Sequence, residues 1–193
     1  MTFYQIVEKW CEQYKHMRHH PPDNIRFMFT DSWQGMIEMA KGISNMQSPC
    51  VVMESAVEGD GPIRRPLFNY PIYFFVRAGK MADGNDAMIA KFKALQHARN
   101  FISYVVKKHE EELNEGNMDG DFARIDLDNV QVSYQSIGPL ENGWFAVMIQ
   151  LQREEPINFC GDEGLYDDLL SKDDKMKDDK MKDSASSGIN ENL

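Results

Sequence analysis

Two small groups of polar residues have the types and spacing that metal chemistry would need. His16 and His20 are four residues apart, so a continuing helix would place both imidazoles on one face. No cysteine stands at ligand spacing beside them, and a solvated helix end is the simpler interpretation. Asp119-Gly120-Asp121 begins like a calcium loop, but no glutamate closes a loop of twelve, which favours a polar turn. The sequence therefore predicts no metal site and no cofactor.

Catalytic motifs are also absent from the sequence. Cys11, Cys50 and Cys160 form no CxxC pair, and we expect buried or idle thiols. Gly59-Asp60-Gly61 lacks the lysine and following helix of a phosphate loop, and no Gly-x-Ser-x-Gly is present. An active site assembled from distant residues would leave no such trace, so an enzyme stays open as one alternative. We nevertheless predict no catalytic residue and a protein that is not an enzyme.

The composition favours a soluble, acidic protein. The chain has 193 residues and a formal net charge of -10, which argues against a protein that grips nucleic-acid phosphates. It does not argue against a protein that surrounds DNA without gripping it. No apolar run is long enough for a membrane helix, and Met1–Gln5 lacks the features of a signal peptide. We expect a protein made and used in a cytoplasm.

The hydrophobic periodicity predicts an α+β fold, with a helix, a β-hairpin, a long helix and a second β-hairpin. Together the strands should form a mostly antiparallel sheet packed by the helices. The expected helices span 3–20, 31–44 and 85–114; the expected strands and extended segments span 25–29, 50–55, 70–77, 130–136 and 143–152.

The long helix at 85–114 is the central element of this prediction. Its larger hydrophobic residues, in a helical repeat, should form a broad apolar face toward the sheet: Met88, Phe92, Leu95, Phe101, Ile102, Val105, Val106 and Leu113. Gly138-Pro139 and Asn142-Gly143 should form the turn between the last two strands.

The composition shifts after about Pro156, which predicts a domain at 1–156 and an extended acidic C-terminal arm at 157–193. Ten acidic residues and five lysines fall between Gly161 and Leu193. Residues 161–171 suffice for one or two turns of amphipathic helix, which could fold back or dock on a partner. A five-residue repeat at 172–181 builds no apolar stripe and should be solvated or disordered alone.

Two segments are candidate partner-binding sites. One is the long loop after the first predicted strand, where two arginines are either solvated or contact an acidic neighbouring subunit. The other is the apolar group in the arm. The candidate residues are Asp60, Ile63, Arg64 and Arg65 in the loop, and Leu165, Tyr166, Leu169 and Leu170 in the arm.

The element order over residues 1–153 resembles the tail-terminator and head–tail connector (neck) proteins of tailed bacteriophages. The resemblance rests on Pro49–Glu54, the loop at 58–70, the strand at 71–77, the helix at 85–114, and the pair 130–136 and 143–152. It is architectural and includes no residue signature. The helix at 31–44 and the arm depart from the pattern.

The resemblance implies a structural virion protein, assembled in the host cytoplasm, that forms a homo-oligomeric ring. Its partners would be further copies of itself and neighbouring portal, neck or tail proteins. DNA would pass through the lumen without specific binding, and a negatively charged lumen would let it slide. No membrane partner is implied. The alternative is a cytoplasmic adaptor or chaperone-like module that binds a partner through its C-terminal segment.

Overall fold

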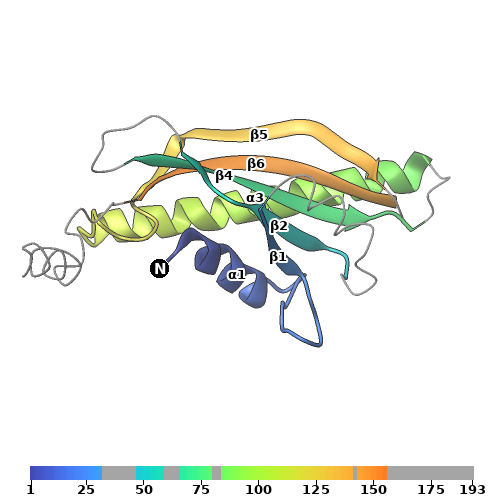
Figure 1. Ribbon diagram of the computed structural model, residues 1–193, viewed down its shortest axis with the longest axis horizontal. Coiled ribbons are helices and arrows are strands. Elements are labelled where there is room, and N and C mark those ends of the chain that lie inside the picture. The colour runs from blue at the N-terminus through green and yellow to red at the C-terminus, as the bar shows by residue number, and fades with distance from the viewer. Residues whose placement is uncertain (32–46, 59–65, 80–83, 141–142, 156–193) are drawn as a thin grey trace, which may run out of the picture. The chain divides into compact units, whose positions relative to one another are not determined.

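The computed structural model describes residues 1–31, 47–58, 66–79, 84–140 and 143–155, without the side chains of 57–58 and 133–136 (Figure 1). The predicted helix at 31–44, apart from its first residue, lies outside the described residues, as does the arm at 157–193. Met1–Glu155 forms one compact unit. No helix among the described residues is long and apolar enough to cross a membrane.

A single sheet organises the described part of the chain and confirms the predicted α+β class. Its strand order is β1-β2-β4-β6-β5, and β3 pairs with β4 beside that path. Only β1 and β2 pair in parallel among these strands. The strands are β1 (Phe27–Thr30), β2 (Cys50–Glu54), β3 (Val57–Glu58), β4 (Leu67–Arg77), β5 (Ile125–Leu140) and β6 (Trp144–Glu154).

The strand β4 occupies the middle of the sheet because both of its faces are apolar. Ile72 and Phe74 point into the main core and are fully buried. Tyr73 and Phe75 point the other way, into a smaller cluster that includes Trp144, and they are buried too. Burial on both faces is what the apolar alternation at 72–77 predicts.

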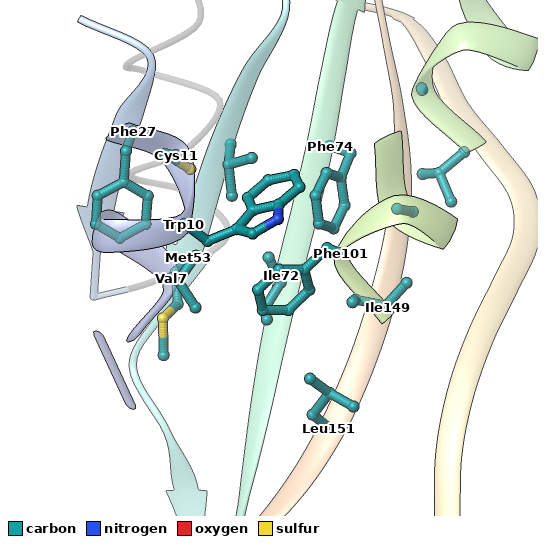
Figure 2. Packing of buried hydrophobic residues seen from close by; sticks show 14 of the residues in the cluster. Val7, Trp10, Cys11, Phe27, Met53, Ile72, Phe74, Phe101, Ile149 and Leu151 are labelled. Atoms are coloured by element: carbon teal, nitrogen blue, oxygen red, sulfur yellow. The ribbon is translucent and has the colours of Figure 1, made fainter. Parts of the chain in front are cut away.

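Helices α1 (Phe3–Gln13) and α3 (Gly84–Asn114) pack with the sheet in the main core. In Figure 2, Trp10 of α1 lies against Phe74 of β4 and Phe101 of α3. The ring centroids of Trp10 and Phe101 are 5.0 Å apart, and those of Trp10 and Phe74 are 6.1 Å apart. One aromatic side chain therefore joins both helices to the central strand.

The first helix is shorter than the predicted 3–20. It begins at a Thr2 capping box but ends at Gln13. The chain then turns, with Arg18 at a φ of 50°. The side chain of Asn24 donates hydrogen bonds to the carbonyl oxygens of Met17 and Arg18. These carbonyl groups are satisfied by a side chain a few residues further along the chain and not by a continuing helix, a choice that hydrophobic periodicity does not encode.

The long helix α3 has the predicted bounds to within one residue, but its buried face differs from the prediction. Met88 and Phe92 are 52% and 66% exposed, and Leu113 is 40% exposed. Phe101 and Val105 are fully buried as predicted, and Leu95 and Ile102 pack against the core in part. The other buried residues are mostly small: Ala90, Ala94, His97 and Ala98. Alanine at positions 90, 94 and 98 allows the helix backbone to approach the sheet closely, and Met88 and Phe92 lie on the exposed side.

The last hairpin is longer than predicted. Strand β5 spans Ile125–Leu140 and includes Gly138 and Pro139, which were expected in the turn. Its pairing with β6 shifts register at three places, and two of these shifts flank Ile137. Gly138 has a φ of +123°, and a Cβ there would lie 2.7 Å from the carbonyl oxygen of Trp144. The glycine therefore serves a bulged strand.

Candidate functional site

All of the sequence-predicted partner-binding residues lie outside the described residues. They are Asp60, Ile63, Arg64 and Arg65 in the loop, and Leu165, Tyr166, Leu169 and Leu170 in the arm. Strands β3 and β4 bracket the first of these segments and pair antiparallel, Val57 with Asn69 and Glu58 with Phe68. In sequence, residues 59–65 therefore lie between two strands that pair with each other.

The histidines near the end of α1 do not form the face that their spacing suggested, because the helix ends before them. His16 and His20 are exposed, while His19 is buried. The His19 Nδ1 atom accepts hydrogen bonds from the backbone N–H groups of Arg26 and Phe27, with N–N distances of 3.0 and 3.2 Å. Burial lowers the pKa of His19, which keeps the ring a neutral acceptor. This side chain holds the chain before β1 in place.

A second imidazole lies beside α1 in a polar cluster. The Tyr14 hydroxyl accepts a hydrogen bond from the Asn100 amide at 2.7 Å and lies 3.0 Å from His97 Nδ1. The hydroxyl and His97 Nδ1 share a hydrogen bond whose direction follows the tautomer of the ring. Burial, then the nearby charges of His16 and Lys93, lowers the pKa of His97 to about 4. The ring is therefore neutral at neutral pH, and its hydrogen bond with Tyr14 joins α3 to the residue that follows α1.

The polar turn predicted at Asp119-Gly120-Asp121 is present, and Asp121 has a role that the sequence did not reveal. Its Oδ1 atom lies 3.0 Å from Arg153, 3.1 Å from Arg124 and 3.0 Å from the Met1 amino group. Arg153 is fully buried and also pairs with Glu155 at 2.8 Å. This ion network links the N-terminus, the turn after α3 and the end of β6.

Thiol and metal chemistry find little support in the described part of the chain. Cys11 and Cys50 are free and buried, as expected, and burial raises the pKa of both thiols. Raised pKa values leave the thiols protonated and unreactive at neutral pH. No group of three or more His, Cys, Asp or Glu side chains among the described residues is arranged to hold a metal ion.

The strongest candidate for an interaction site is the outer surface of α3. Three large apolar side chains project there from the first turns of the helix, with Phe92 the most exposed. A shallow groove beside them is lined by apolar and basic residues. We call this surface the outer patch; it consists of Met88, Ile89, Phe92, Lys93, Leu95, Gln96 and Arg99.

Sequence reasoning missed the outer patch because it assigned the largest apolar residues of α3 to the core. The signal that could have located it is the alanine repeat at 90, 94 and 98. Those positions share one helical face, and Phe92 lies on the opposite one. A small-residue face beside a sheet and a bulky face toward solvent together indicate a surface available for contact.

The comparisons with known proteins identify no relative. No protein-family profile, curated protein or solved structure matches this chain.

Proposed function

We propose that this chain is a structural virion protein that forms a homo-oligomeric ring in the neck or tail of a tailed bacteriophage. The proposal is carried by one observation: the two hairpins, β2/β4 and β5/β6, flank a long helix in sequence and join in a single sheet in space. That architecture is the one on which the resemblance to tail-terminator and neck proteins rests. In this role the ring joins head and tail components around a DNA channel.

The two edges of the sheet support assembly by unlike surfaces. One edge is β1, of four residues and parallel to β2; the other is β5, of sixteen residues and bulged. A ring arises when a head-to-tail contact between two different surfaces repeats by a rotation that closes. A protomer with two dissimilar edges and an apolar outer patch offers such surfaces. The net charge of -10 suits a lumen through which DNA slides.

The native mass of the full-length protein tests this proposal. We expect a discrete oligomer of many copies, rings in negative-stain micrographs, and incorporation into particles on co-expression with a portal protein. A monomer at every concentration, absent from purified virions, would overturn the proposal. If such a monomer also bound a cytoplasmic partner and lost it on truncation after Pro156, the adaptor function would replace it.

A further inference from the structure

The outer patch is basic in a chain that is strongly acidic. Between Asp86 and Glu110 the helix sequence has lysines and an arginine but no acidic residue. Lys93 and Arg99 are exposed, and no carboxylate among the described residues forms an ion pair with either. A surface with apolar side chains and a basic rim fits a segment with apolar anchors and acidic flanks.

One segment of this chain has that chemistry. Residues 161–171 contain four apolar or aromatic anchors and four acidic residues, without a basic one: Leu165, Tyr166, Leu169 and Leu170, with Asp162, Glu163, Asp167 and Asp168. We propose that the outer patch of one copy binds residues 161–171 of a neighbouring copy. This inference rests on the proposed self-assembly and names the contact that links adjacent protomers.

The reach of the chain favours a neighbouring copy as the source of the segment. Strand β6 begins beside Lys91, whose ammonium lies 5.4 Å from the Phe145 ring, and ends beside Leu113, which shares a groove with Glu154. From Phe92 to Leu113 the helix rises about 30 Å. The eleven residues from Glu154 to Leu165 span about 40 Å at most when fully extended. As a flexible tether they span on average only about 20 Å. Docking within one copy would therefore stretch the tether well beyond its average length, whereas a neighbouring copy whose patch lies within that average reach binds the segment at a lower entropic cost.

The apolar content of the patch favours a peptide over nucleic acid. Phe92, Met88 and Ile89 are 66%, 52% and 41% exposed, and all three precede Lys93 and Arg99 on the helix. A nucleic acid binds through contacts between its phosphates and clustered cations, and the burial of methyl and aromatic groups against a duplex backbone adds nothing to its affinity. A leucine-rich acidic segment contacts both the apolar and the basic side chains of the outer patch.

Cross-linking between two differently tagged full-length chains tests the contact. Both carry Cys160→Ser; one carries Gln96→Cys in the outer patch, and the other carries Ser171→Cys at the end of the segment. After co-expression, a short bismaleimide should join the two chains. Adding Phe92→Ser and Lys93→Glu to the first chain should lower the heterodimer yield at least about tenfold, because an aromatic anchor and a charge contact are lost together. Both side chains are exposed, so the fold should be unchanged.

The outcomes separate this contact from ring formation itself. Absence of the heterodimer, in an oligomer whose native mass is intact, would overturn the contact and leave the proposed function standing. A monomeric native mass would overturn both. A chain carrying Gln96→Cys and Ser171→Cys that cross-links only within itself would overturn the role of the neighbour. Retention of a labelled DNA duplex by the patch, lost with Lys93→Glu, would assign the surface to nucleic acid instead.

Discussion

Arg153 is the fully buried cation of the ion network. Its guanidinium donates hydrogen bonds to the side chains of Asp121 and Glu155 and to the carbonyl oxygens of Asp121 and Met1. We expect Arg153→Ala to lower the free energy of unfolding by about 3 kcal/mol, since it leaves two carboxylates without their buried partner. The urea midpoint at constant pH measures this.

The matched control for Arg153 is Arg124→Ala. Arg124 also contacts Asp121, but its side chain is 16% exposed and Arg153 remains in place. Its loss should cost under about 1 kcal/mol, because water replaces part of the contact. Equal losses for the two variants would contradict the assignment of Arg153 as the centre of the network.

His97 should make the stability of the protein depend on pH between about 6.5 and 4. Its pKa in the folded chain is about 4, below the ordinary value of 6.5, because burial disfavours the charged ring. The unfolded chain therefore binds the proton first as pH falls. The stabilisation is complete above pH 6.5 and is lost progressively toward pH 4, by an amount on the order of 2 kcal/mol.

The measurement for His97 is the difference in unfolding free energy between pH 7 and pH 4, compared with His97→Gln. The glutamine amide can still form a hydrogen bond with Tyr14, and the variant should lose less stability over this range than the parent. His20→Gln is the control, since that imidazole is exposed. An unchanged pH dependence in His97→Gln would rule out His97 as the source.

At the scale of elements, α3 makes the sharpest prediction about packing. Ala94 is fully buried against the sheet, whereas Phe92 is 66% exposed. Ala94→Leu should destabilise the fold by about 1–3 kcal/mol because it forces the helix away from the sheet. Phe92→Ala should change stability by less than about 0.5 kcal/mol. Urea denaturation of both variants measures these two changes in stability. A larger loss for Phe92→Ala than for Ala94→Leu would restore the buried face predicted from the sequence.

The contrast on α3 also marks how far the sequence determines the fold. The bounds of α3, the strand β4 and the antiparallel last hairpin follow from hydrophobic periodicity, caps and β-branched or aromatic runs, which are local signals. The complete buried face of α3 does not, because the spacing between helix and sheet decides whether Ala94 or Phe92 lies against the sheet. The early end of α1 is not a local signal either, since Tyr14 continues the helical spacing of apolar residues and yet adopts an extended backbone.

The candidate site was less predictable than the fold for a related reason. Periodicity identifies residues that are apolar and regularly spaced, but it does not say whether the surface they face belongs to the same copy. Phe92 satisfies the helical pattern as well as Phe101 does, yet only Phe101 is buried. The helix α3 presents a buried and an exposed apolar face in one sequence, as the proposed contact with a second copy requires.

At the scale of the whole molecule, the proposed assembly would have to overcome a net charge of -10 on every copy. Like-charged protomers repel, so contacts between them should involve their basic residues. The loop at 59–65 carries Arg64 and Arg65 between two strands of one hairpin, and the outer patch carries Lys93 and Arg99. We therefore expect the proposed ring to weaken as salt rises, because screening at an ionic strength of 0.1 M already limits exposed charges to about 10 Å.

The loop arginines provide the direct test of this charge argument. Arg64→Glu with Arg65→Glu should lower the apparent association constant at least about tenfold, since two attractive contacts become repulsive. Native mass spectrometry across a dilution series measures the constant, and the urea midpoint of the domain should stay unchanged. Lys180→Glu with Lys182→Glu makes the same change in net charge within the arm and serves as the control. If both pairs weaken assembly equally, net repulsion alone accounts for the loss and the loop contributes no specific contact.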